Sequence, residues 1–399
     1  MKNFKIKLIV VGMAGVILAL STVLLLKNSD SGSIKSHPDQ WQKPNNVLSG
    51  EVSLPVRKTN NKEAPFVIGV LYWSMNIPGQ VAMRKGLEAQ AEEINANSSR
   101  EKPVIILKEY VAGDGVAGME RQIRQMHELI DGKVDLIIVQ PTDIAALREP
   151  LIRANKEKIP VIAYDQHIID GQLACYITSD NYQAGYLDGE YVAANFPQNK
   201  KLRIILVEYP HVSSTVKRVD GFIDALEQYE QAYEIIKSYN AVEPEGGREA
   251  GAEILRDFPE PGSFDVIFTV NDGGGLAILQ ALDAAGRKEV FFASVDGDPI
   301  SVMNIKKGNV MRIDSAQFCG VLGSESMKMA YRLLKGERIP RQVLIPSFPI
   351  TRETVDMYKG WNAPMPEPFK KPWHSNTPEW SGKPRIINAQ EDANHAQRK

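Results

Sequence analysis

Residues 104–140 read VIILKEYVAGDGVAGMERQIRQMHELIDGKVDLIIVQ, and this stretch decides the fold class. It begins and ends with apolar runs, at 104–111 and 134–140, which predict buried strands. Between them, apolar residues recur every three or four positions, at Met119, Ile123, Met126 and Ile130. This spacing predicts an amphipathic helix. Two buried strands joined by such a helix are the unit from which parallel sheets are built.

The same alternation extends from residue 65 to residue 320. The predicted strands are 67–71, 104–111, 134–140, 160–165, 174–178, 203–209, 234–239, 265–270, 289–296 and 311–317. Helical spacing recurs between them, for example at Met83, Leu87, Ala91 and Ile94, and at Val219, Phe222, Ile223 and Leu226. Ten strands exceed a typical single sheet. The expected fold class is therefore α/β, with two doubly wound Rossmann-like lobes that each contain a parallel sheet.

The composition is typical of soluble globular domains. Of the 399 residues, 43% are apolar and 24% are charged, which excludes a disordered chain, a collagen-like repeat and a multi-span membrane protein. The formal net charge of −2 gives no support to a nucleic-acid binder. Two cysteines, Cys175 and Cys319, are too few for a disulfide framework or a zinc site. Whether these two form one disulfide with each other stays open at this point.

Residues 8–26 form a stretch of 19 uncharged and mostly apolar residues. As a helix, this stretch comes close to the ~30 Å hydrocarbon core of a bilayer. Lys2, Lys5 and Lys7 precede it, so residues 1–7 are expected to stay in the cytoplasm while the rest is exported. The stretch is longer than the apolar region of a usual signal peptide and no Ala-x-Ala site follows. A retained membrane anchor is slightly favoured over a cleaved signal, and both remain open.

The segments on either side of the alternating region differ from it. Residues 28–63 are rich in Ser, Asn, Lys and Pro and predict a linker. Residues 362–399, the C-terminal tail, hold six prolines and two of the five tryptophans, Trp373 and Trp380. Proline at this density prevents helix and central strand. The tryptophans indicate that the tail lies against a lobe.

One glycine-rich loop raises an enzymatic alternative. Residues 113–118, GDGVAG, match the G-x-G-x-x-G pattern of dinucleotide-binding loops. The acid expected about 20 residues later is missing, because Gln140 stands there, and the loop follows the second strand of its lobe instead of the first. A plain turn into a helix is the favoured interpretation, and a nucleotide-dependent oxidoreductase is the alternative. The sequence has no His-Glu-x-x-His pair, Gly-x-Ser-x-Gly elbow or phosphate-binding loop, so it predicts no enzyme, no catalytic residue, no cofactor and no metal.

Polar residues stand at the carboxyl ends of five predicted strands. They are Gln140, Asp165 with Gln166, Asn271, Asp296 and Gln317. In open α/β sheets, ligands bind at this edge. Turn and helix-cap chemistry can explain any one of these residues. Five strand ends with the same polarity predict a ligand-binding site.

At these residues the sequence resembles the periplasmic sugar-binding proteins of the ribose/galactose type, the type I periplasmic binding proteins that supply ABC transporters. The resemblance covers residues 65–360 and rests on VQPTD (139–143), IPVIAYD (159–165), ITSDN (177–181), FTVND (268–272), VDG (295–297), LLKG (333–336) and ITRE (350–353). It implies two lobes joined by a three-segment hinge, with one small ligand enclosed between them. Lobe one would be 65–180 with 318–345, and lobe two 181–317 with 346–361.

The resemblance also implies the ligand-binding residues. Asp165, Asn271, Asp296 and Gln317 match positions that bind sugar hydroxyls, and Gln140 stands where the family often has Asn. Trp73 or Tyr72 is the candidate plate for the apolar face of a sugar ring, and Asn76 belongs to the Asn-x-Pro loop. Four departures from ribose binders stand out: Gly79-Gln80 replaces an aromatic pair, Gln166 replaces an Arg, Val216 replaces a sugar-binding Arg, and the aromatic expected at 242–245 is absent. These departures argue against ribose and admit a small amine as an alternative.

The sequence therefore predicts an extracytoplasmic solute-binding protein that captures a monosaccharide-like ligand for an ABC importer. The alternative is a membrane-anchored sensing subunit that works with a sensor kinase or chemoreceptor. The expected partners are the ligand, a permease or sensor, and the membrane through residues 8–26. A sugar-responsive repressor would share the two lobes, but an apolar segment stands where its DNA-binding helices would be.

Overall fold

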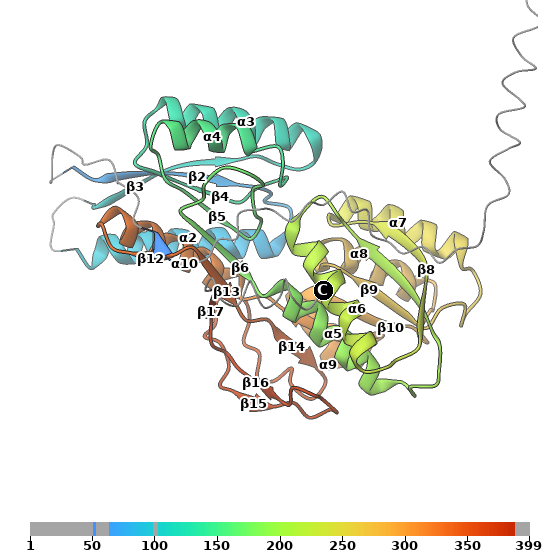
Figure 1. Cartoon of the computed structure of the whole chain (residues 1–399). Coiled ribbons are helices and arrows are strands. Elements are labelled where there is room, and N and C mark those ends of the chain that lie inside the picture. Colours follow the sequence, from blue (N-terminus) through green and yellow to red (C-terminus); the bar gives the residue numbers. More distant parts are fainter. Residues whose placement is uncertain (1–50, 53–63, 99–102, 388–399) are drawn as a thin grey trace, which may run out of the picture. The chain divides into compact units, whose positions relative to one another are not determined.

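The computed structural model of this chain describes residues 51–52, 64–98 and 103–387 (Figure 1). The predicted membrane segment, 8–26, lies outside these residues, and the helices that are described include none apolar and long enough to cross a bilayer. Of the predicted linker, 28–63, only β1 (Glu51–Val52) has a described conformation, and it pairs antiparallel with β12 (Ile339–Pro340).

One sheet forms lobe one, in the order β17-β13-β6-β5-β4-β2-β3. Its strands are β2 (Phe66–Tyr72), β3 (Ile105–Val111), β4 (Leu136–Val139), β5 (Val161–Tyr164), β6 (Cys175–Ser179), β13 (Gln342–Ile345) and β17 (Arg385–Ile386). Its helices are α2 (Pro78–Ala96), α3 (Gly115–Asp131), α4 (Arg148–Lys156) and α10 (Cys319–Leu334). Both faces of the sheet are covered (Figure 1): Val70 packs in one apolar cluster with Leu87 of α2, and Leu71 in another with Leu129 of α3. The alternation follows from successive strand residues pointing to opposite faces.

A second sheet forms lobe two, in the order β14-β11-β10-β9-β7-β8. Its strands are β7 (Leu202–Glu208), β8 (Tyr233–Asn240), β9 (Val266–Thr269), β10 (Phe291–Asp296), β11 (Met311–Ala316) and β14 (Phe348–Thr351). Its helices are α5 (Asn181–Asn195), α6 (Ser213–Gln228), α7 (Pro244–Asp257), α8 (Asp272–Ala284) and α9 (Pro299–Lys307). Phe222 of α6 stacks on Phe268 of β9, with 4.2 Å between ring centroids.

All ten predicted strands are present, and their ends differ from the prediction by at most two residues. The expectation of purely parallel sheets is wrong at one edge of each sheet. β14 runs antiparallel to β11, and β17 runs antiparallel to β13. β14 begins two residues after β13, with Phe348 opposite Ala316 at the carboxyl end of β11, so the chain enters lobe two at that end and runs back along the sheet.

The chain passes between the two sheets at three places: from β6 to α5, from β11 to α10, and from β13 to β14. The C-terminal tail adds β15 (Phe369–Lys370) and β16 (Glu379–Trp380), which pair with each other, and returns to lobe one as β17. Trp380 is buried, and its Nε1 donates to the carbonyl of Ser347 at 2.7 Å. The prediction that the tail lies against a lobe is therefore confirmed for its described part, residues 362–387.

The tail contacts lobe two as well as lobe one. Lys371 Nζ lies 2.7 Å from Glu190 Oε2 in α5, and both side chains are almost completely buried. Trp373 Nε1 donates to the same carboxylate oxygen at 3.0 Å. Arg385, in β17, forms an ion pair with Asp180, which caps α5 at the first passage between the sheets. The tail thus connects the two lobes a fourth time.

Candidate ligand-binding site

Two carboxylates in unusual backbone conformations mark the site. Asp165 follows β5 in lobe one, Asp296 ends β10 in lobe two, and both are buried. Their φ angles are 65° and 137°, in the region that favours glycine. Such strain persists only where the surrounding structure imposes it, and it is concentrated at functional sites. Both residues line one cavity.

This cavity, the cleft site, draws its lining from both lobes. Of the residues predicted from sequence, the structure brings together here Trp73, Asp165, Gln166, Asn271, Asp296 and Gln317. Sequence reasoning missed others, among them Ile77, Met83, Ser214, Arg218, Val242 and Cys319. Val242 stands in the region where the aromatic was missing from the sequence. The cavity volume is about 30 Å³, room for about two water molecules.

Two of the predicted residues do not line the cleft site. Asn76 is exposed, and its Nδ2 donates to Asp114 Oδ2 at 2.5 Å, because the loop before α2 turns toward the start of α3. Gln140 is completely buried behind Asp165, and its Nε2 donates to Asp165 Oδ2 at 2.9 Å. Its Oε1 accepts a 3.4 Å hydrogen bond from the amide of Trp73. Gln140 therefore positions Asp165 and the Trp73 backbone.

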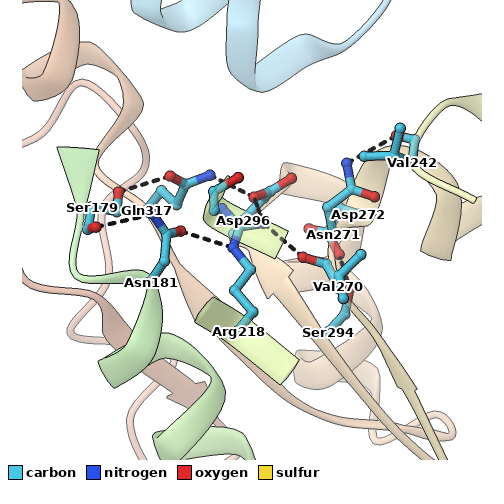
Figure 2. Close-up of polar contacts among 12 residues, drawn as sticks. Ser179, Asn181, Arg218, Val242, Val270, Asn271, Asp272, Ser294, Asp296 and Gln317 are labelled. Carbon is cyan, nitrogen blue, oxygen red and sulfur yellow. Dashed lines mark hydrogen bonds and ion pairs between the residues drawn. The ribbon is translucent and has the colours of Figure 1, made fainter. Parts of the chain in front are cut away.

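Asp296 belongs to a fully connected polar network (Figure 2). Its Oδ1 lies 3.1 Å from Arg218 Nη1 and accepts a 2.6 Å hydrogen bond from Gln317 Nε2. Gln317 in turn accepts from Ser179 Oγ at 2.7 Å. Burial raises the pKa of Asp296 to about 6, although the charge of Arg218 opposes the shift. The network joins β10, α6 and two of the passages between the lobes.

Arg218 is a lining residue that the sequence-based site did not include. It lines the cavity and pairs with Asp296. Its Nε also donates to Asn181 Oδ1 at 2.9 Å (Figure 2). A signal was available: Arg218, Phe222 and Leu226 lie four residues apart on the buried face of α6. An arginine on such a face requires a partner.

Asp165 is in a different electrostatic situation. Its carboxylate forms no ion pair with any described residue, and Oδ2 accepts the 2.9 Å hydrogen bond from Gln140. Burial raises its pKa, while the Gln140 hydrogen bond and the charge of Arg218 act in the opposite direction. When both aspartates are ionised, the cleft site carries one more negative than positive charge.

Asn271 lines the cavity but also serves as a helix cap. Its Oδ1 accepts from the amide of Gly274 at 3.1 Å, and its Nδ2 donates to the carbonyl of Val242 at 2.9 Å (Figure 2). The neighbouring Asp272 accepts from Ser294 Oγ and from the amide of Asp298. At this strand end, cap chemistry accounts for most of the side-chain contacts.

Direct hydrogen bonds connect the lobes beside the cavity. Gln166, after β5, donates from Nε2 to Ser214 Oγ at 2.7 Å, and its Oε1 accepts from the Ser214 amide at 3.2 Å. The amide of His167 donates to Ser213 Oγ at 3.2 Å. Ser213 and Ser214 begin α6 in lobe two. Gln166 thus contacts the opposite lobe as well as the cavity.

The structure shows why the loop at Gly113 needs its glycines and whether the two cysteines are joined. Gly113 and Gly115 have φ angles of 88° and 62°, and a Cβ on Gly118 would lie 1.9 Å from the Gly113 carbonyl oxygen. The glycines are needed for a tight turn into α3, and the preceding β3 is an edge strand. Cys175 and Cys319 are both free and buried, so they do not form a disulfide.

Comparison with known proteins agrees with this geometry. The profile of the periplasmic binding protein domain matches residues 68–338, more than half of the chain. The chain therefore belongs to the periplasmic binding protein family, and it is a type I solute-binding protein, the kind that its sequence resembles.

Three similar proteins illustrate the range of this family. The ribose import binding protein of Bacillus subtilis is 26% identical over 328 residues, which cover 82% of this chain and 97% of that protein. A solute-binding protein from Bacillus halodurans, solved with bound myo-inositol, is 24% identical with a TM-score of 0.65 and covers 75% of this chain and 99% of that one. The fructose-binding periplasmic domain of a hybrid two-component system is 22% identical with a TM-score of 0.63, covering 73% and 92%. These two solved structures have the same fold as this chain.

Proposed function

We propose that this protein binds a small polyhydroxylated ligand outside the cytoplasm and delivers it to an ABC importer, without catalysing a reaction. The observation that carries this proposal is that Asp165 and Asp296, which come from different lobes, line one cavity. A ligand that contacts both carboxylates is held by both lobes. Binding is thereby coupled to closure about the hinge.

The chemistry of the lining suits vicinal hydroxyl groups. Asp165 and Asp296 offer carboxylate acceptors, whereas Arg218, Gln166 and Gln317 offer planar donors. Hydrogen bonds to charged groups are roughly twice as strong as neutral ones. Trp73, which is buried in the same lining, provides an apolar face for a sugar or cyclitol ring. Relatives named for ribose and solved with myo-inositol add support for a ligand of this class.

A small amine is the second candidate for the ligand. Asp296 already has its cation in Arg218, but Asp165 has none among the described residues. An ammonium group placed between Asp165 and the Trp73 ring would balance the excess negative charge and gain a cation–π contact. An amino-substituted cyclitol or sugar would satisfy both halves of the site.

Ligand capture between the lobes can serve either of two uses. It can deliver the ligand to an importer, or it can signal the presence of the ligand to a membrane sensor. The shared fold of the fructose-binding domain in a hybrid two-component system supports the second use. We propose that residues 8–26 tether the protein on the outer face of the inner membrane. Intact-mass measurement of protein purified from membranes tests the tether. A chain that retains residues 8–26 has its full mass, whereas a chain whose signal has been cleaved is shorter.

Titration of the full-length protein in detergent tests the ligand proposal. D-Ribose, D-allose, myo-inositol and an aminocyclitol are added while the melting temperature and tryptophan fluorescence are followed. A ligand at about 100 times its Kd stabilises the native state by about 2.7 kcal/mol. Asp165→Asn should remove the response, and Asn76→Ala, outside the cleft site, should keep it. If no ligand of the panel changed the melting temperature or the tryptophan fluorescence, the result would count against a polyol- or amine-binding function.

A further inference from the structure

A second cavity, of about 210 Å³, lies in lobe two at the sheet edge opposite the cleft site. Its lining includes Phe291 and Met311, the first residues of β10 and β11, whereas the cleft site is lined by Asp296 at the other end of β10. Tyr191 and Ile305 complete a buried apolar floor. The remaining lining residues are exposed: Asn195, Gly308, Arg312, Arg352 and Glu353. We name this feature the arginine pocket.

Two arginines face each other across neighbouring strands at its rim. β11 and β14 pair antiparallel with Ile313 opposite Thr351, so Arg312 and Arg352 occupy the next step of the ladder. Like charges opposite each other destabilise a strand pair. Neither arginine has an ion pair or hydrogen bond with any described residue. Glu353 is the carboxylate in the lining, and its Oε2 accepts from the Tyr191 hydroxyl at 3.0 Å. The pocket therefore has an excess of positive charge.

The floor of the pocket is held in place from below. Tyr191 is fixed at its hydroxyl by Glu353, and its ring meets the ring of Trp373 edge-on, with 5.1 Å between centroids. Trp373 is in turn anchored to Glu190 by its indole N–H. Arg352, Glu353 and Trp373 all lie beyond residue 338, where the match to the family ends. The pocket is thus built partly by the C-terminal part of this chain.

We infer that the arginine pocket binds a small organic anion, with its carboxylate on Arg312 and Arg352 and an apolar or aromatic body on the floor. A guanidinium pairs with a carboxylate in a bidentate geometry, and two of them around one anion remove the like-charge repulsion. The buried floor gains from covering by an apolar group. This site is separate from the cleft site and does not depend on the proposed function.

Phenylacetate is a suitable probe, because it joins a carboxylate to an aromatic ring. Calorimetry with the full-length protein in detergent compares it with phenylacetamide, which lacks the charge, and with acetate, which lacks the ring. We expect saturable 1:1 binding of phenylacetate. Both analogues should bind at least about tenfold more weakly than phenylacetate, a difference in binding free energy of about 1.4 kcal/mol. Equal binding of acetate and phenylacetate would mean an adventitious ion only and would overturn the inference, as would no binding of phenylacetate at about 10 mM.

Variants locate the site. Arg312→Gln with Arg352→Gln should weaken phenylacetate binding about tenfold or more. Arg124→Gln, an exposed arginine of α3 in lobe one, is the matched control and should bind as the parent does. Asp165→Asn should also leave phenylacetate binding intact, which separates this site from the cleft site. Phenylacetate binding that survives the double substitution, or that is lost with Asp165→Asn, would contradict the assignment.

Discussion

Gln166 of lobe one donates a 2.7 Å hydrogen bond to Ser214 of lobe two and accepts another from the Ser214 amide. Both residues also line the cleft site. These bonds join the two lobes directly, so they exist only while the lobes are together. Gln166 therefore links ligand contact to closure.

Replacing Gln166 with Ala should weaken ligand binding about 5- to 150-fold. Two hydrogen bonds, each contributing about 0.5–1.5 kcal/mol, would no longer favour the closed form. Calorimetry with the ligand identified by titration gives the affinity, and small-angle scattering gives the open fraction without ligand. Asn76→Ala is the control, because its side chain bonds within lobe one. Unchanged affinity in the Gln166 variant would show that closure does not use these bonds.

Replacing Arg218 with Met should both destabilise the protein and abolish ligand binding. The substitution leaves Asp296 buried without its cation, which typically costs about 3–5 kcal/mol. Urea denaturation measures the loss. Adding Asp296→Asn to Arg218→Met should recover part of the stability but none of the binding. A double variant no more stable than the single variant would argue that the pair contributes through packing instead of charge.

The contact of the tail with Glu190 should be essential for stability. Lys371→Met leaves the buried Glu190 carboxylate without its cation and should cost about 3 kcal/mol. Lys370→Met changes the adjacent, exposed lysine and should have almost no effect. Thermal unfolding compares the two directly. Similar melting temperatures for both variants would mean that the tail does not stabilise lobe two.

Stability should fall as the pH rises from about 4 to about 7, with Asp314 as one cause. Burial raises the pKa of Asp314 to about 7, helped by the nearby charges of Asp188 and Asp296. In the unfolded chain its pKa is about 3.9, so in this interval the unfolded state releases a proton that the native state retains. The stabilisation is complete below the unfolded pKa and is lost as the pH passes through the folded value.

Asp314→Asn tests this pH dependence. The amide cannot titrate, so the slope of unfolding free energy against pH should become shallower by about 1.4 kcal/mol per pH unit in that interval. The Asn oxygen can still accept from the Gly297 amide, as Asp314 Oδ1 does. Urea denaturation at several pH values gives the slope. If the parent and the variant have the same slope, another buried group is responsible.

Much of the fold could be predicted from local pattern. Burial on both faces makes a strand a short apolar run, and burial on one face makes a helix periodic, so both signals are present within a few residues. The strands around Leu71 and Val139, for example, were predicted within two residues of their observed ends. The carboxyl-end positions of Asp165 and Asp296 follow from the same pattern, because they end two of these runs.

Partnerships between distant residues could not be predicted in this way. Arg218 and Asp296 are 78 positions apart, and Lys371 and Glu190 are 181 positions apart. Nothing in the neighbourhood of either residue specifies the other, because pairing depends on the order and direction of strands across two sheets. For the same reason Asn76 was predicted in the site, although its loop directs it to Asp114.

The sequence by itself determined the two-lobe α/β architecture and the row of polar strand ends, since burial periodicity is a local property. Only the tertiary structure decided the charge balance of the cleft site. It gives Asp296 a cation and leaves Asp165 without one among the described residues. It also brings the C-terminal tail to both lobes and sets Arg312 opposite Arg352. These relationships arise where segments distant in sequence pack together, and there long-range contact fixes which charges are compensated.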